Sequence, residues 1–112
     1  TIAITRLGAG ALVEPGRALV TLTGAAEDTD MRWLDDTRRS VGRQWGRAPS
    51  LMEVVPAILE WPGAPARVKA WALDERGQRG AEIPVAPGAT ADRARIQLGP
   101  PAKTPWYMIE MQ

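Results

Sequence analysis

The chain of 112 residues contains no cysteine, histidine, asparagine or phenylalanine, and it has a single tyrosine. The absence of cysteine excludes a disulfide scaffold, a thiolate zinc site and a cysteine nucleophile. The absence of histidine excludes a Ser-His-Asp triad and histidine metal ligands. Only two serines occur, Ser40 and Ser50, and neither lies in a Gly-x-Ser-x-Gly elbow. The commonest nucleophilic and metal-dependent reactions therefore have no candidate residues.

Other catalytic signals are also weak. Gly8-Ala9-Gly10 lacks the later glycine and the following helix of a phosphate-binding loop. Paired carboxylates can hydrolyse glycosides, but we interpret the acids in or beside the expected strands as solvated strand-face or turn residues: Glu53, Glu60, Asp74, Glu82 and Glu110. We therefore expect a protein that is not an enzyme.

Charge and hydropathy limit the partners. Fourteen basic and thirteen acidic residues leave a formal charge of +1, whereas a nucleic-acid binder is expected to carry a clear basic excess. No apolar run approaches the roughly 20 residues that a membrane span needs. We expect neither a nucleic acid nor a membrane as partner. Because the sequence has no initiator Met and no signal peptide, we expect a piece of a longer precursor or multidomain protein.

One acidic cluster raises the question of a metal. It has only loose calcium-like spacing and lacks the D-x-D-x-D-G order, and its members are Glu27, Asp28, Asp30, Asp35 and Asp36. Arg32, Arg38 and Arg39 lie close enough in sequence to neutralise it. We expect no cofactor, and a structural calcium is the alternative.

Hydrophobic residues make up 45% of the chain, which is typical of a folded domain. Glycine and proline divide the chain into short runs that alternate or are rich in β-branched residues, a pattern of strands rather than helices. Residues 1–112 are expected to form one antiparallel β-sandwich, immunoglobulin-like or jelly-roll-like, with about eight strands. The runs are Ile2–Leu7, Ala18–Thr23, Met31–Trp33, Leu51–Val55, Ala57–Trp61, Val68–Leu73, Glu82–Val85, Arg93–Leu98 and Trp106–Met111.

Two hairpins are predicted. In VKAWALDERGQRGAEIPV, Asp74 and Gly77 occupy the first and fourth positions of a type I turn. The segments ARIQLG and WYMIEM form the second expected pair, joined by GPPAKTP. Asp28–Arg39 has acids early and arginines late, as a helix dipole favours, but it lacks an apolar stripe and holds at most a single helical turn.

The five tryptophans are about three times ordinary usage, and strand alternation predicts different environments for them. Trp61 shares a face with Ala57 and Leu59 and is expected in the core. Trp71 shares a face with Lys69 and is expected on the wet side of its strand. Trp106 is expected to be half exposed at best, opposite a core set formed by Tyr107, Ile109 and Met111.

Trp33 and Trp45 lie in the most polar segment, MRWLDDTRRSVGRQWG, residues 31–46. One interpretation is that both indoles fold inward and anchor a long loop as a satellite cluster. The other is an exposed aromatic platform, which usually marks a binding site. Such a platform suits bases of single-stranded nucleic acid or the C–H faces of sugar rings. Arginine–aspartate pairs, which can hydrogen-bond polyols bidentately, favour the sugar.

The order of four segments resembles the C-terminal β-sandwich domain of bacterial glycoside hydrolases. These segments are VEPGRALVTLTGAAEDTDMRW, QWGRAPSLMEVVPA, VKAWALDERGQRG and TPWYMIEM, within residues 12–111. The most specific parts are Trp45–Glu53, Ala72–Gly77 and Thr104–Tyr107. Asp28-Thr29-Asp30 departs from an expected Asn-Thr-Gly type turn. The resemblance implies a secreted or extracellular accessory domain of a larger bacterial enzyme, and some such domains bind carbohydrate.

The leading hypothesis is a non-catalytic carbohydrate-binding module that binds β-glucan, such as cellulose or a mixed-linked glucan, or xyloglucan, and targets an attached glycoside hydrolase domain to it. We assign ring stacking to Trp33, Trp45 and Trp71. Hydrogen bonds to hydroxyls are assigned to Asp35, Asp36, Arg38, Arg39 and Gln44. The alternative is a structural domain that packs on the catalytic barrel without binding sugar.

Overall fold

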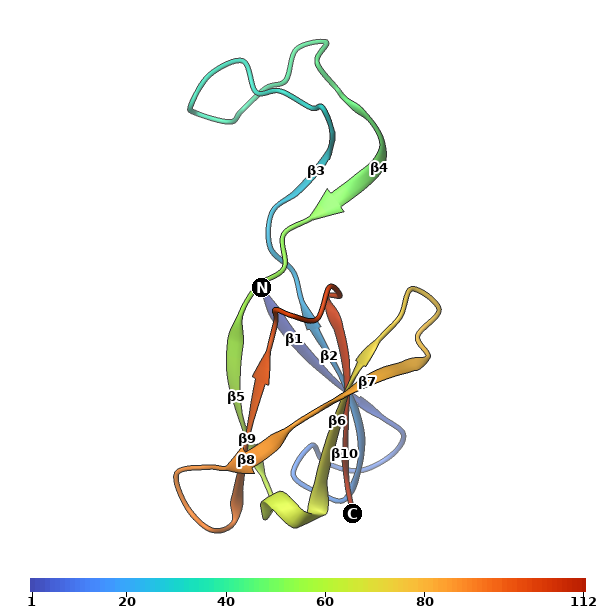
Figure 1. Cartoon of the computed structure of the whole chain (residues 1–112), viewed down its shortest axis with the longest axis vertical. Coiled ribbons are helices and arrows are strands. Elements are labelled where there is room, and N and C mark those ends of the chain that lie inside the picture. Colours follow the sequence, from blue (N-terminus) through green and yellow to red (C-terminus); the bar gives the residue numbers. More distant parts are fainter. The chain divides into compact units, whose positions relative to one another are not determined.

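The computed structural model describes all residues, 1–112, and is built almost entirely of strands (Figure 1). Every strand pair is antiparallel, which confirms the predicted all-β antiparallel class. The only helical element has three residues, far too few to cross a membrane. The elements are β1 (Ile2–Leu7), β2 (Gly16–Leu22), β3 (Ala26–Thr29), β4 (Arg47–Met52), β5 (Ala57–Pro62), η1 (Pro65–Arg67), β6 (Val68–Leu73), β7 (Arg79–Ile83), β8 (Val85–Pro87), β9 (Arg93–Leu98) and β10 (Trp106–Met111).

The chain forms two compact units. The larger unit comprises Thr1–Thr23 and Val54–Gln112, and the smaller one, called here the hairpin arm, comprises Gly24–Glu53. The two ends of the arm lie side by side, since the Glu53 amide donates a hydrogen bond of 2.8 Å to the Ala25 carbonyl.

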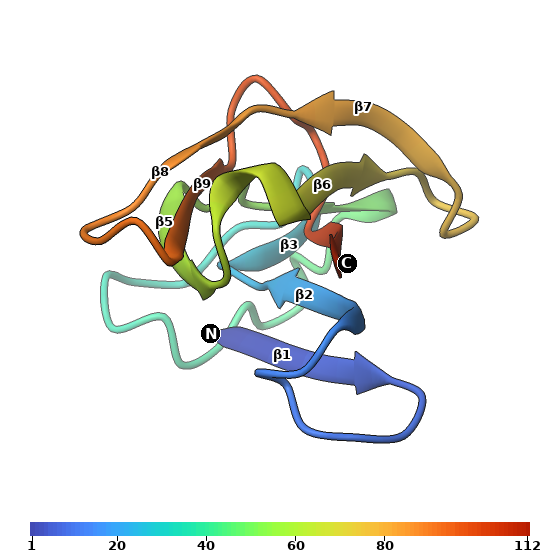
Figure 2. The ribbon, with the colours of Figure 1, turned by 90° about the horizontal axis from the view of Figure 1, so that it is seen from below.

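The larger unit contains a five-stranded sheet, β1-β2-β10-β6-β7, and a three-stranded sheet, β5-β9-β8. Figure 2 shows β1 beside β2 and β6 beside β7. Buried side chains from both sheets form one hydrophobic core, as in a β-sandwich. Its members include Val20, Leu22, Trp61, Ala70, Ile96, Leu98, Tyr107 and Ile109.

Strand alternation explains which side chains enter this core. Tyr107, Ile109 and Met111 are buried on one face of β10, as predicted. Trp61 is only 5% exposed, which confirms its predicted core position. The Asp74–Gly77 turn is also confirmed, since the Gly77 amide donates to the Asp74 carbonyl over 3.0 Å.

The second predicted hairpin is wrong. β9 pairs with β5 and β8, whereas β10 pairs with β2 and β6, so the two strands lie in different sheets. Ile96 and Leu98 on β9 and Ile109 on β10 contribute to the same core from opposite sides. The connection through GPPAKTP therefore crosses between the sheets instead of making a tight turn within one.

Three other strand predictions needed correction. Met31–Trp33 is a loop, and the strand in this region is β3, which ends at Thr29, two residues before Met31, and was not predicted. The strand predicted at Leu51–Val55 begins at Arg47 and ends at Met52. Pro84 has no amide hydrogen and separates β7 from β8, so Glu82–Val85 is not a single strand. The chain has ten strands as a result.

Candidate functional site

The hairpin arm is a long hairpin that continues beyond its regular strands. β3 and β4 pair from Ala26–Met52 to Thr29–Arg47. Beyond them the Arg32 amide donates to the Gln44 carbonyl over 3.1 Å, and the Leu34 amide donates to the Ser40 carbonyl over 2.9 Å. The segment Asp28–Arg39, expected to hold at most a single helical turn, contains no helix. Residues 31–46 instead fold back on themselves, and we call them the tip segment.

Two backbone features shape the start of the tip segment. Asp30 has a left-handed backbone, φ +63°, in a turn closed by the Met31 amide and the Asp28 carbonyl at 3.1 Å. Gly46 lies opposite this turn, and a Cβ built there would lie 2.4 Å from the Thr29 carbonyl oxygen. The two chain segments approach so closely that only glycine fits at position 46.

The two indoles of the tip segment have different environments. Trp33 is half-buried, and its Nε1–H donates a hydrogen bond of 2.7 Å to the Glu27 carboxylate. Trp45 is 67% exposed. Trp33 thus matches the anchor interpretation, and Trp45 is the indole that is free to contact a ligand.

The polar residues assigned to the site are all exposed in the tip segment. Asp35 accepts hydrogen bonds from the Thr37 hydroxyl and amide, which lower the pKa of its carboxyl below the ordinary value. The remaining four, Asp36, Arg38, Arg39 and Gln44, make no side-chain hydrogen bond or ion pair within the protein. Their polar groups are therefore available to a ligand.

The expected arginine–aspartate pairs do not form within the tip segment. The arm has one ion pair, in which Arg47 Nε lies 2.9 Å from the Asp30 carboxylate, close to the regular strands. The acidic cluster is instead satisfied by neutral donors, since Asp28 accepts from the Ser50 hydroxyl and Glu27 from Trp33. Nowhere do three or more acidic side chains gather in a way that could hold a metal ion.

Trp71 belongs to the larger unit, not to the hairpin arm that holds the other seven assigned residues. It is half-buried on β6, and the Arg79 guanidinium lies 4.0 Å from the centroid of its ring. Arg79 also pairs with Glu110 on β10. One face of this indole is therefore already covered by a cation–π contact.

The outer face of the five-stranded sheet carries an apolar cluster that the sequence-based site did not include. The pairing register places Met108 between Leu19 and Trp71. Leu73 is 5% exposed but lies outside the main core, and Trp106, beside it, is 39% exposed. This cluster of Leu19, Trp71, Leu73, Trp106 and Met108 is called the outer face below. The sequence carried a signal for this cluster. Strand alternation places Trp71 and Leu73 on one face of β6, and Trp106 and Met108 on one face of β10.

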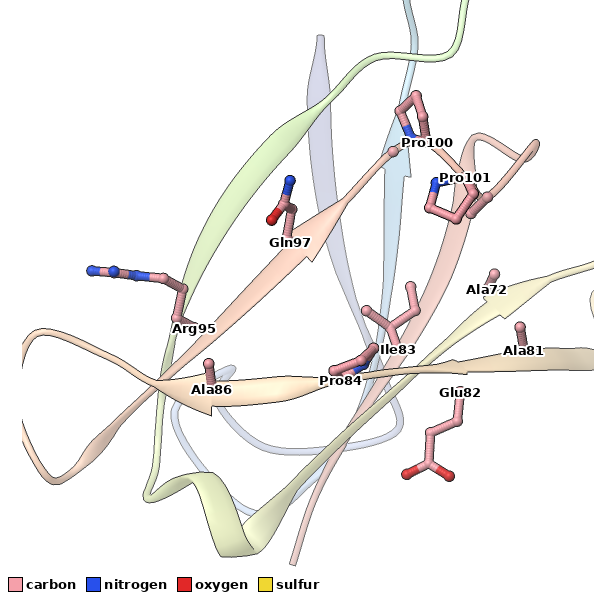
Figure 3. Close-up of a pocket in the computed structure, with 12 residues that line it drawn as sticks. Ala72, Ala81, Glu82, Ile83, Pro84, Ala86, Arg95, Gln97, Pro100 and Pro101 are labelled. Carbon is pink, nitrogen blue, oxygen red and sulfur yellow. The ribbon is translucent and has the colours of Figure 1, made fainter.

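A pocket in the larger unit is lined by residues of β7, β8 and β9 and by the segment 99–102 that follows β9 (Figure 3). It has a volume of about 580 Å³, and its lining is mostly alanine, glycine and proline with Ile83. Glu82 and Arg95 point away from Pro100 and Pro101 in Figure 3. Arg95 is engaged by Glu60, with 2.8 Å between its Nε and the carboxylate. The lining supplies no pair of carboxylates.

Most acids considered for glycoside hydrolysis have structural partners. Glu60 accepts from Arg95 and from the Ala89 amide, and its pKa is lowered mainly by Arg95. Glu110 pairs with Arg79, and the Asp74 carboxylate accepts from the Arg76 and Gln78 amides. These contacts fix strands and turns.

Comparison of the chain with protein families, with curated proteins and with solved structures finds no match. The functional argument therefore depends on the residues and their geometry.

Proposed function

We propose that the chain is a non-catalytic polysaccharide-binding module whose hairpin arm contacts the sugar chain. The observation that carries this proposal is the 67% exposure of the Trp45 indole in a segment where the side chains of Asp36, Arg39 and Gln44 lack partners. An indole left in water is a favourable surface for the C–H face of a sugar ring, and tryptophan is enriched among dominant binding residues. Asp36, Arg39 and Gln44 supply acceptors and donors for hydroxyls.

Two further points support this function. Trp33 is held by Glu27, and the tip backbone is closed by several hydrogen bonds, so the site is largely ordered before binding. The resemblance to accessory domains of glycoside hydrolases suits a module that tethers an enzyme to its substrate. Such tethering raises the effective concentration of the enzyme even when one contact is of only about micromolar to millimolar affinity.

The test is affinity electrophoresis through gels that contain neutral or acidic polysaccharides, including mixed-linked β-glucan, hydroxyethylcellulose, xyloglucan and polygalacturonate. At least one polysaccharide should retard the protein. Trp45→Ala should weaken binding about tenfold or more, since a dominant aromatic contact is worth roughly 2 kcal/mol. Trp106→Ala removes an exposed indole from the larger unit and should leave retardation unchanged. Absence of retardation in every gel would refute the proposal.

The outer face favours a second candidate, a structural domain that packs on an attached catalytic domain. Its apolar cluster of Leu19, Trp71, Leu73, Trp106 and Met108 has the mixed apolar and charged surroundings of an interdomain face. On this reading, Trp106→Ala and Trp71→Ala weaken association with the attached domain, and no polysaccharide binds. Loss of polysaccharide retardation in Trp45→Ala alone favours the first function.

A further inference from the structure

Acidic and basic residues are unevenly distributed in the hairpin arm. Acidic residues gather near the regular strands, where Glu27, Asp28, Asp30 and Glu53 line a shallow hollow together with Arg38. The tip segment holds the other three arginines that follow β3 and precede β4, Arg32, Arg39 and Arg43. Arg38 therefore lies beside carboxylates, and the remaining three form the basic part of the tip segment.

These three arginines have no acidic partner in the protein. All three are exposed, and every ion pair of the chain involves other residues. Of the two aspartates in the tip segment, Asp35 already accepts hydrogen bonds from Thr37. Asp36 is the one tip carboxylate without a hydrogen-bond partner.

The backbone brings these arginines and Trp45 together on one short length of hairpin. The 3.1 Å bond from the Arg32 amide to the Gln44 carbonyl places Arg32 across from the residues that flank Gln44, namely Arg43 and Trp45. The bond of 2.9 Å from the Leu34 amide to the Ser40 carbonyl places Arg39, the residue before Ser40, in the same folded segment.

From this arrangement we infer that the polysaccharide of the proposed function is acidic, a chain that carries uronate carboxylates. A guanidinium forms two parallel hydrogen bonds to a carboxylate, so Arg32, Arg39 and Arg43 match carboxylates better than neutral hydroxyls. Trp45 stacks on the same chain. The arginine–aspartate pairs that favoured a neutral sugar in the sequence do not form in the tip segment.

This inference rests on the proposed function and selects among its ligands. Asp36 and the acidic hollow disfavour a densely charged phosphate backbone, whereas their carboxylates can accept hydrogen bonds from sugar hydroxyls. The neutral β-glucan expected from the sequence is the direct competitor.

The test compares polygalacturonate with hydroxyethylcellulose, dextran sulfate and oligothymidine by isothermal titration at low and physiological salt. Polygalacturonate should bind at least tenfold more tightly than the other three, and its affinity should fall as salt rises. The variant Arg32→Gln/Arg39→Gln/Arg43→Gln should lose at least tenfold of this affinity. The matched control Arg17→Gln/Arg76→Gln/Arg93→Gln removes the same charge from exposed positions in the larger unit and should lose less than twofold.

The possible failures are distinguishable. Equal or tighter binding of hydroxyethylcellulose would overturn the acidic ligand and leave the polysaccharide-binding function intact. Equal binding of dextran sulfate or oligothymidine would overturn it in favour of non-specific polyanion binding. Equal losses in the tip and control variants would also overturn it. Failure of every polysaccharide to bind would refute the proposed function itself.

Discussion

Tyr107, the single tyrosine, connects the two sheets of the larger unit through its hydroxyl. The Gly99 amide, buried just after β9, donates a hydrogen bond of 3.0 Å to this oxygen. Tyr107 itself lies on β10 in the other sheet. The bond gives a partner to a buried donor at the point where the chain crosses between the sheets.

Tyr107→Phe should lower the free energy of unfolding by about 1–3 kcal/mol, because it leaves the buried Gly99 amide without an acceptor. Chemical denaturation measures this directly. The exposed substitution Lys103→Gln should change stability by less than about 0.5 kcal/mol. An unchanged midpoint in Tyr107→Phe would show that the hydrogen bond has no net effect.

Glu60 should make stability depend on pH. Its pKa is lowered in the folded protein, mainly by Arg95 and also by the Ala89 amide. The contribution is therefore present above the unfolded pKa, about 4.3, and is lost as the pH falls through the folded pKa. Denaturation of Glu60→Gln should show lower stability than the unmodified chain at neutral pH, and the difference should shrink in acid. A difference independent of pH would contradict this role.

At the scale of elements, the hairpin arm depends on Gly46, a position where only glycine fits. Gly46→Ala places a Cβ against the Thr29 carbonyl oxygen at a residue with φ +77°. We expect faster amide exchange in residues 29–31 and 45–47 and loss of polysaccharide binding, with an unchanged core. Gly77→Ala is the control, since φ there is +75° but nothing lies within 4 Å of the added Cβ. Amide exchange in Gly46→Ala at the rates of the unsubstituted protein would contradict the close approach of Gly46 to Thr29.

Strand positions with clear alternation were predictable from the sequence. Ile2–Leu7, Val68–Leu73, Arg93–Leu98 and Trp106–Met111 match β1, β6, β9 and β10 residue for residue. Alternation cannot give the pairing partner, which explains the wrong hairpin of β9 with β10. It also failed for β3, whose residues, AEDT, have neither an apolar face nor β-branched enrichment.

The site was only partly predictable for a related reason. The composition of residues 31–46 indicated a long polar loop with two indoles, but the anchoring of Trp33 depends on its hydrogen bond to Glu27, which lies outside that segment. Opposite charges close in sequence also suggested arginine–aspartate pairs. The turn geometry directs Asp35 to Thr37 instead, so the arginines are left without partners.

At the scale of the whole molecule, the core and the candidate site belong to different units. All members of the hydrophobic core lie in the larger unit, and the ends of the arm are joined by the Glu53 amide and Ala25 carbonyl. The stability of the core therefore does not depend on side chains of the arm, which carries the proposed binding site.

Replacement of residues 26–52 by a short Gly-Ser linker should leave a folded larger unit, because no core side chain is removed and the chain ends to be joined are adjacent. The blue-shifted fluorescence of buried Trp61 and a cooperative thermal transition measure folding. Polysaccharide binding should be lost. An unfolded product would show that the arm is required for the core to form.

The central claim, that the hairpin arm binds polysaccharide through Trp45, is tested most directly by the five indole N–H signals in a nitrogen–proton NMR spectrum during titration with oligogalacturonate. The Trp45 signal should shift progressively to saturation, the Trp33 signal should follow to a smaller extent, and the signals of Trp61, Trp71 and Trp106 should stay in place. Shifts of Trp71 and Trp106 with an unmoved Trp45 would contradict the account and place binding on the outer face.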